Sequence, residues 1–408
     1  MYFIGQAISL CGTWMQTIGQ DWLVLQLTKS GTQLGIVSAF QFLPVLFLAP
    51  YGGVIADRFS KRKILLFTQT IAAILALILG LLVVIGGIKI WMIYILAMCL
   101  GLVNAVDNPT RQTFVSEMVD KKHLPNAVAL NSTEVNLARA IGPVIAGVII
   151  AVVGIGLCFL INAASYIAVI IMLAMMRHDE LFIAEKIQKA KGQIREGVKY
   201  IMSTPLLFHT LMMMVIIGTL SYEFSVSLPL LAQFTFHGNA ESYSFLVAAM
   251  GIGSIIGGYF AIRRKKVAPH LLIFSALGFG ISLSIAAWMP TLPLAVIMLF
   301  FAGISSLNFI SLGNTILQLY SKPEMRGRVM AFWTMAFSGS TPIGGPIIGW
   351  VGQEFGARWG LAVGGFAAIV AAFYGAVIIL QKSAKAKLIS EDVSIRDEEN
   401  EAWSNKRI

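Results

Sequence analysis

Residues 53–63 read Gly53-Val54-Ile55-Ala56-Asp57-Arg58-Phe59-Ser60-Lys61-Arg62-Lys63. A long apolar run ends in this stretch, and a dense cluster of basic residues follows it directly. Lysine and arginine gather on the cytoplasmic side of membrane-spanning helices. The stretch therefore predicts that residues 33–56 cross a membrane and that a loop at its cytoplasmic face follows them.

The composition of the whole chain also indicates a membrane protein. Of its 408 residues, 57% are hydrophobic and only 12% are charged. A typical soluble domain is about 25% charged, and no soluble core of this size would hold so many apolar residues. The net charge of +10 is expected from cytoplasmic loops and predicts no nucleic-acid partner.

Apolar runs of spanning length occur twelve times along the chain. The first six predicted spans are 3–27, 33–56, 64–86, 90–116, 128–153 and 155–176. The second six are 206–234, 243–262, 268–289, 292–317, 328–352 and 359–381. Turns at Gly154 and Gly156, and at Pro290 and Pro293, divide the two longest runs. The expected fold class is an all-α integral membrane protein with twelve transmembrane helices in two pseudo-symmetric six-helix bundles.

The distribution of charge predicts the orientation of these spans. Of the 30 lysine and arginine residues, all but Lys29, Lys89, Arg358 and Arg139 fall in alternate connections or the C-terminal tail. This asymmetry predicts that both termini are cytoplasmic. Five tryptophans fall at the other ends of the spans and are expected to form an interfacial belt. They are Trp22, Trp91, Trp288, Trp350 and Trp359.

A long polar connection divides the spans into two sets of six. The expected organisation is an N-terminal bundle 1–177, a cytoplasmic linker 178–204, a C-terminal bundle 205–381 and a cytoplasmic tail 382–408. Apolar residues recur in the linker with helical spacing, which favours an amphipathic helix on the membrane surface. They are Ile187, Ile194, Val198 and Ile201. A solvated linker is the alternative.

The two halves share sequence features at nearly one offset. Gly142-Pro143-Val144-Ile145-Ala146-Gly147 recurs as Gly345-Pro346-Ile347-Ile348-Gly349, and the Gly53 stretch has a weaker copy from Gly258 to Lys266. Both pairs indicate a duplicated six-helix unit. Parallel repeats of this kind are typical of alternating-access transporters.

Residues 53–63 resemble the loop between helices two and three of the major facilitator superfamily, with Ser60 replacing the usual glycine and Lys61 the usual arginine. The Gly142-Pro143 stretch is similar to the helix-five motif of the antiporters in that superfamily. Residues 107–112 resemble its exporter branch, which contains the enterobactin exporter and macrolide and multidrug efflux pumps. The resemblance implies the major facilitator fold in a bacterial inner membrane.

The same resemblance implies roles for two groups of residues. A cytoplasmic gate is expected at Gly53, Asp57, Arg58, Arg62 and Arg111. In it Asp57 latches the halves near the start of the eleventh helix, and Arg111 is an ion partner. A stiff, bent helix that limits leakage is expected at Gly142, Pro143, Gly147, Gly345 and Pro346. Simple orientation by the basic residues and simple packing at the glycines are the alternatives.

Ionisable residues inside the spans are costly unless paired or hydrated, so they are candidate functional groups. Asp21 and Glu223 hold related positions in the first and seventh spans and are predicted to couple protons or to bind a cation. Buried acids satisfied by hydrogen bonds, or for Asp21 a solvated position near the outer surface, are the alternatives. Asp107, Glu134 and Arg139 are predicted to form a buried ion cluster, with substrate or proton-relay work as the alternative. A polar stripe on the first span predicts a substrate cavity lined by Trp14, Gln16, Thr17, Gln20 and Tyr222.

The sequence offers no catalytic apparatus: His209 and His237 are isolated, and no nucleotide-binding loop occurs. We expect no enzyme activity, catalytic residue, cofactor or metal site. The predicted function is proton-coupled export of an amphiphilic small molecule, such as a drug or siderophore, by a monomer in the lipid bilayer. An importer or lipid flippase of the same fold, or a membrane sensor or subunit that transports nothing, is the alternative.

Overall fold

The computed structural model describes residues 2–120, 122–176, 193–264, 267–322 and 324–380, and within these ranges it contains helices and no strand. The first half consists of six long helices. They are α1 (Tyr2–Thr28), α2 (Gly31–Arg58), α3 (Lys61–Val84), α4 (Ile90–Phe114), α5 (Leu124–Val152) and α6 (Ile155–Met175).

The second half begins after a shorter helix, α7 (Gln193–Ser203). Its seventh rod is broken into α8 (Pro205–Leu220), α9 (Phe224–Leu230) and a π-helix (Leu231–Thr235). Three continuous helices follow: α10 (Ala240–Arg263), α11 (Pro269–Trp288) and α12 (Leu292–Tyr320). The eleventh rod is broken into α13 (Arg326–Ser338) and α14 (Thr341–Glu354), and α15 (Ala357–Gly375) completes the bundle.

These helices fall into the twelve rods that the sequence predicts, within the described ranges. Ten of them are long and apolar enough to cross a membrane. The other two are α1, which carries the polar stripe, and the rod formed by α13 and α14, which is interrupted. The fold class is thus an all-α integral membrane protein, as predicted.

Two glycines make the internal repeat visible in the backbone. Gly154 precedes α6 with φ 100°, and Gly356 precedes α15 with φ 102°. Residues with a Cβ rarely adopt this left-handed conformation, so glycine is required at both turns. The same turn therefore recurs before the last helix of each half, and the predicted turn at Gly154 is confirmed.

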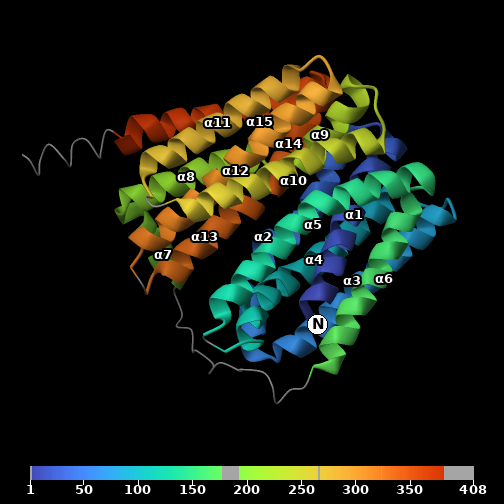
Figure 1. Ribbon diagram of the computed structural model, residues 1–408, viewed down its shortest axis with the longest axis horizontal. Coiled ribbons are helices and arrows are strands. Elements are labelled where there is room, and N and C mark those ends of the chain that lie inside the picture. The colour runs from blue at the N-terminus through green and yellow to red at the C-terminus, as the bar shows by residue number, and fades with distance from the viewer. Residues whose placement is uncertain (1, 121, 177–192, 265–266, 323, 381–408) are drawn as a thin grey trace, which may run out of the picture.

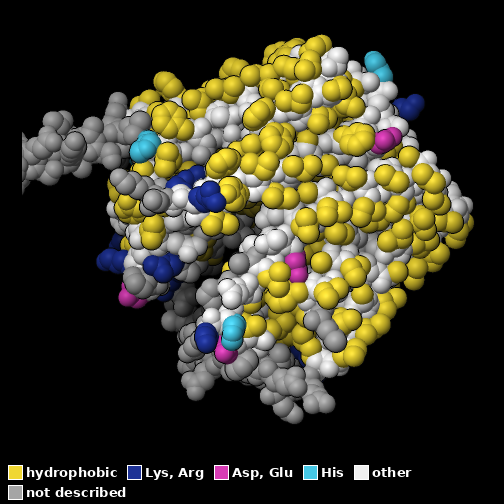
Figure 2. All heavy atoms as spheres, viewed as in Figure 1, with side chains coloured by type: hydrophobic (Ala, Val, Ile, Leu, Met, Phe, Trp, Pro, Cys, Tyr) yellow, Lys and Arg dark blue, Asp and Glu magenta, His cyan; other side chains and the backbone are white. Residues whose placement is uncertain are grey.

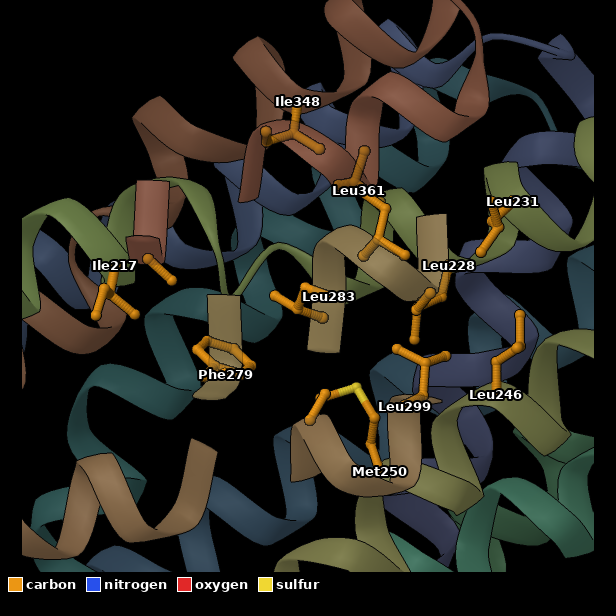
Figure 3. Packing of buried hydrophobic residues seen from close by; sticks show 14 of the residues in the cluster. Ile217, Leu228, Leu231, Leu246, Met250, Phe279, Leu283, Leu299, Ile348 and Leu361 are labelled. Carbon is orange, nitrogen blue, oxygen red and sulfur yellow. The ribbon is translucent and has the colours of Figure 1, made fainter. Parts of the chain in front are cut away.

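Figure 1 shows two groups of helices, α1–α6 in blue to green and α8–α15 in green to red. In the first group α1 packs between α5 and α6, and α2 packs on α4. In the second, α12 packs on α10 and α11, and α15 packs on α11. Figure 3 shows side chains of these helices meeting in the interior, among them Phe279, Leu283 and Leu299, which are fully buried. The predicted boundaries at 177 and 381 fall on residues outside the described ranges, so the domain limits remain predictions.

One end of the helix bundle carries most of the basic residues and is called the basic end below. Lys61 forms an ion pair with Glu117 just after α4. Arg62 donates hydrogen bonds to the carbonyl oxygens of Leu173 (2.6 Å) and Ala174 (2.7 Å). These carbonyls lie in the last turn of α6, where the helix offers no backbone donor and attracts a cation. Both side chains therefore tie helices together in addition to any role in orientation.

Helix α7 lies at the basic end against α13. Its Glu196 pairs with Arg328 at 2.6 Å, and the Tyr200 hydroxyl accepts a hydrogen bond from the Lys322 backbone N–H at 3.0 Å. Ile201 is buried, whereas Val198 is exposed. Ile187 and the side chain of Ile194 lie outside the described part, so the full amphipathic face remains a prediction.

Four of the five belt tryptophans lie as predicted at the end opposite the basic end. Trp91, Trp288, Trp350 and Trp359 are each about half exposed. The prediction for Trp22 was wrong, because it is buried in the main core with 5% exposure. Helix α1 contacts α9 and α10 of the second half as well as its own bundle, so its outer turns are covered by protein.

Candidate functional site

The two halves meet along α2 and α14, where glycines bring the backbones into direct contact. A Cβ added at Gly349 would lie 2.2 Å from the Gly31 carbonyl oxygen, and one added at Gly35 would lie 2.3 Å from that of Gly345. Near the end of the bundle opposite the basic end, the Ser30 hydroxyl donates a hydrogen bond to Gln353 Oε1 at 2.5 Å. Small residues permit such close approach of membrane helices.

A second contact between the halves joins α5 to α10. A Cβ at Gly147 would lie 2.9 Å from Ser244 Cβ, and one at Gly251 would lie 2.8 Å from Ala140 Cα. Gly142 faces its own half, since a Cβ there would lie 2.6 Å from Trp14 Cβ. Three residues of the predicted helix-bend motif, Gly147, Gly345 and Gly142, thus lie at close helix contacts. Their role in limiting leakage remains a prediction.

The two prolines of that motif lie inside continuous helices, Pro143 in α5 and Pro346 in α14. Proline lacks the N–H that would bond to the carbonyl four residues earlier. In α5 this leaves the Arg139 carbonyl without its usual helical donor, at a place where Gly251 of α10 packs closely.

Asp21 joins the two halves by hydrogen bonds. It lies in α1 with 4% exposure, and its Oδ2 accepts from the Tyr243 hydroxyl of α10 at 2.8 Å. The Ser225 hydroxyl of α9 makes a second side-chain hydrogen bond to this carboxylate. Both donors belong to the second half, so Asp21, Tyr243 and Ser225 form a clasp, which we call the Asp21 clasp.

The surface is hollowed between the two halves on the side of the basic end, as Figure 2 shows. Of the predicted gate residues, Gly53 and Arg58 lie in the last turns of α2, and Arg58 is exposed. Arg62 bonds to the end of α6 in its own half, and Arg111 pairs with Asp107. The side chain of Asp57 lies outside the described part, so the latch remains a prediction.

The predicted cluster of Asp107, Glu134 and Arg139 is wrong as a contact. Asp107 is 1% exposed and accepts from Thr68 Oγ1 (2.6 Å), Gln69 Nε2 (2.9 Å) and the Arg111 guanidinium. No ion pair among the described residues joins Arg139 to either acid. Residues five apart on a helix are turned by about 140° from each other, so Glu134 and Arg139 point to different sides of α5.

Arg139 lies instead on an aromatic ring. Its guanidinium carbon is 5.2 Å from the ring centroid of Trp14, a cation–π contact. Its Nε is buried without a hydrogen-bond partner. Tyr222 of the second half is close enough to interact electrostatically with it. Trp14 and Arg139 thus lie together midway along the first half, within electrostatic range of Tyr222 in the second half.

A polar pocket lies beside α1 in the first half. Its volume of about 40 Å³ suits a few water molecules rather than a drug-sized ligand. The lining residues are Thr13, Gln16, Thr17, Gln20, Gln41, Leu100, Asn104 and Tyr166. Gln20 Nε2 donates to Gln41 at 3.1 Å, and Asn162 Nδ2 donates to Gln16 at 2.6 Å.

The pocket contains three of the five predicted cavity residues, Gln16, Thr17 and Gln20, while Trp14 contacts Arg139 and Tyr222 lies among the aromatic rings of the second half. Sequence reasoning missed Gln41, Asn104 and Tyr166. Each of these three residues places an amide or hydroxyl group within an otherwise apolar run, and this pattern could have indicated them.

The second half contributes an aromatic wall around Tyr222. Its ring lies 5.1 Å from that of Phe337 and 5.2 Å from that of Phe279, and 5.9 Å from that of Phe224. Its hydroxyl lies 2.9 Å from Ser306 Oγ. The first half therefore contributes a polar pocket and the second half a group of aromatic rings.

Glu223 lies in the break between α8 and α9 and is 3% exposed. Its carboxylate makes a side-chain hydrogen bond with Thr341, the first residue of α14. Its Oε1 has no hydrogen-bond partner. The break in the seventh rod therefore lies against the break in the eleventh, with a buried carboxyl group between them.

Comparison with known families now identifies the fold. The family model described as transmembrane secretion effector matches residues 1–407. The chain belongs to this family of the major facilitator superfamily. The predicted exporter branch of the superfamily is confirmed, and the chain is a member of a transporter family rather than an enzyme.

Relatives and solved structures agree with this assignment. The chain is 26% identical to the staphyloferrin A transporter of Staphylococcus aureus, over 87% of this chain and 89% of the relative. It is 22% identical to the multidrug efflux pump Tap of Mycolicibacterium fortuitum, over 82% and 84%. A bacterial homologue of the human lysosomal transporter Spinster, in an inward-facing and unoccupied conformation, shares the fold with a TM-score of 0.70 at 14% identity, over 92% of this chain and 94% of that one.

Proposed function

We propose that this protein is a secondary active transporter that exports an amphiphilic small molecule, a drug or a siderophore, in exchange for protons. Membership of a transporter family supports transport. The names of the two relatives, a siderophore transporter and a multidrug efflux pump, support the substrate class. The polar pocket, Arg139 and the aromatic wall offer a mixed surface of the kind that amphiphilic ligands need.

The observation that carries the proton coupling is the environment of Glu223. A buried ionised carboxylate is costly unless it is paired. Glu223 has one bare oxygen, and no cation pairs with it among the described residues. Glu223 therefore binds a proton in this conformation and releases it when movement at the two helix breaks admits water.

Asp21 takes a different part in the proposal. Its carboxylate is bonded across the halves by Tyr243 and Ser225. These hydrogen bonds hold the two halves together at the end opposite the basic end. They break when the halves separate at that end. Asp21 then becomes hydrated and shares in proton or cation binding.

The orientation follows from charge. The basic end faces the cytoplasm of a bacterium, and both termini lie on that side of the inner membrane. In this conformation the hollow between the halves opens toward the cytoplasm, so a monomer with domains 1–177 and 205–381, joined by 178–204, takes up its substrate there. The tail 382–408 stays in the cytoplasm.

Transport by the purified protein in proteoliposomes tests the proposal. A fluorescent amphiphile is loaded, and its movement is followed with and without an imposed pH gradient. A gradient worth about 150 mV supplies about 3.5 kcal/mol per proton, enough for a few hundredfold accumulation. We expect movement out of the compartment that the basic end faces, driven by the gradient. Transport at the same rate and to the same level without a gradient would contradict proton coupling.

A further inference from the structure

Arg139 is a half-buried cation, and the proposed transport mechanism does not explain why its buried Nε has no partner. It lies midway along α5, and none of the acidic side chains that the structure describes pairs with it. The nearest acid on its own helix, Glu134, points to another side. An arginine in the middle of a membrane protein usually has a partner or marks a ligand site.

The surroundings of Arg139 hold its guanidinium in place while leaving donors available. Trp14 lies under it at 5.2 Å from the ring centroid, and Nε has no acceptor. A guanidinium offers five N–H donors in a rigid plane that fits a carboxylate with two parallel hydrogen bonds. A stacked arginine is therefore prepared for an anion, because its orientation is fixed before the ligand arrives.

The opposite wall fits the remainder of such a ligand. Tyr222, which interacts electrostatically with Arg139, is partly exposed, as are Phe224 and Phe337 beside it, while Phe279 of the same group is fully buried and supports these rings from the core. These rings come from the second half, whereas Arg139 and Trp14 come from the first. A molecule bound by both walls would bridge the two halves.

We propose that Arg139, in cation–π contact with Trp14, binds the carboxylate of an anionic amphiphile. This deepens the proposed export function and rests on it. The apolar part of the substrate contacts the rings of the second half. A neutral amphiphile of the same shape binds less tightly, because the buried Nε–H of Arg139 then keeps no acceptor.

Binding of two matched probes tests the proposal. Dansyl-undecanoate and dansyl-undecanamide have the same shape and differ by one carboxylate charge. Their affinities for the purified full chain in detergent are measured by dansyl fluorescence, with protein-free micelles as the blank. We expect the wild-type protein to prefer the carboxylate at least tenfold. Equal affinity for the two probes would overturn the proposal without any variant.

Variants then test whether Arg139 causes the preference for the carboxylate probe. Arg139→Gln is expected to bring the two affinities together, and Arg139→Lys to retain part of the difference. Arg263→Gln is the matched control, since Arg263 also lies over an aromatic ring, Tyr259 at 4.5 Å, but is exposed at the end of α10. Full preference in Arg139→Gln, or its loss in Arg263→Gln, would overturn the assignment to Arg139.

Transport of the same probes separates this inference from the export function. If both probes are exported with a proton gradient at similar rates and affinities, export stands and the carboxylate site is wrong. If neither probe binds or moves, both proposals fail for amphiphiles of this kind. Export of the carboxylate with tenfold or greater preference supports both.

Discussion

Ionisable residues inside the helix bundle differ in how well their buried polar atoms are satisfied by hydrogen bonds. Asp107 has three partners, whereas Asp21 has two partners that both belong to the other half. Glu223 Oε1 and Arg139 Nε are buried and have no hydrogen-bond partner. A fully satisfied group stabilises one arrangement, while an unsatisfied group gains when a proton, ligand or conformational change supplies a partner. We therefore propose a structural role for Asp107 and roles in transport for Glu223 and Arg139.

The role of Asp107 makes a prediction about stability. Asp107→Asn leaves the Arg111 guanidinium, 21% exposed, without its counter-charge. Breaking a buried pair from one side costs about 3 kcal/mol or more, so the melting temperature in detergent should fall by several degrees. Asp120→Asn is the control, because Asp120 pairs with His123 on the exposed surface.

The double variant Asp107→Asn/Arg111→Gln distinguishes a pair from two separate effects. Because it leaves no isolated buried charge, it should lose less stability than the two single variants together. Strict additivity in the same thermal unfolding assay would show that the ion pair does not stabilise the bundle.

The sequence identified these residues but not their contacts. Asp21, Glu223 and Arg139 stand out because they are ionisable residues inside apolar runs. The partner of Asp21 is Tyr243, 222 positions away, and nothing in the spacing of either residue indicates the other. The predicted cluster around Arg139 failed for a simpler reason, because a separation of five residues turns the side chains apart on a helix.

At the scale of helices, closure depends on glycines that let backbones touch. At Gly349 of α14, any Cβ would lie within 2.2 Å of the Gly31 carbonyl oxygen of α2. Gly349→Ala should therefore push the two helices apart at the opposite end and favour separation of the halves there, since overpacking costs about 1–3 kcal/mol. The control is Gly87→Ala in the loop before α4, where a Cβ would meet nothing within 4 Å.

Thiol labelling measures this separation. Leu230 is 1% exposed, and its side chain contacts the position of a Cβ at both Gly31 and Gly352. In a background without Cys11, Cys99 and Cys158, a cysteine at Leu230 should react several-fold faster with a maleimide in Gly349→Ala than in the parent. Unchanged labelling would mean that α2 and α14 tolerate a methyl group without moving.

The Asp21 clasp predicts a related effect from a single hydroxyl group. Tyr243→Phe keeps the buried ring and removes the 2.8 Å hydrogen bond to Asp21. A hydrogen bond contributes about 0.5–1.5 kcal/mol, so labelling at Leu230 should again increase. Tyr259→Phe, on the exposed face of α10, should have no effect. Equal labelling rates in Tyr243→Phe and the parent would mean that the Asp21 clasp does not help to hold the two halves together.

Most helices could be predicted from the sequence, because twelve apolar runs and their turn residues are local signals. Gly154 before α6 is one such signal, and it has the expected positive φ. The breaks at residues 221–223 and 339–340 were not predicted, since both lie inside continuous apolar runs. They depend on packing between the seventh and eleventh rods, where Glu223 meets Thr341. Burial of Trp22 likewise depends on contacts of α1 with the other half.

For the whole molecule, the halves touch through α2 with α14 and α5 with α10 and are hollowed apart at the basic end. An exporter takes up its substrate from the cytoplasm. If the hollow at the basic end is the entrance for substrate, the basic end must therefore face the cytoplasm. We therefore expect Gly87→Cys, at the opposite end, to react with a membrane-impermeant maleimide in intact cells. Lys322→Cys, at the basic end, should react only after the membrane is opened. The reverse pattern would contradict the proposed direction of transport.

The central claim is that Glu223 couples transport to protons, and one measurement tests it directly. Transport of a fluorescent amphiphile is compared in proteoliposomes containing the parent, Glu223→Gln or Glu241→Gln, with and without a pH gradient. Glu241 is an exposed acid in the first turn of α10 and serves as the control. We predict that Glu223→Gln loses gradient-driven accumulation but keeps exchange of labelled for unlabelled substrate. Gradient-driven accumulation in Glu223→Gln at the parent level would contradict the account.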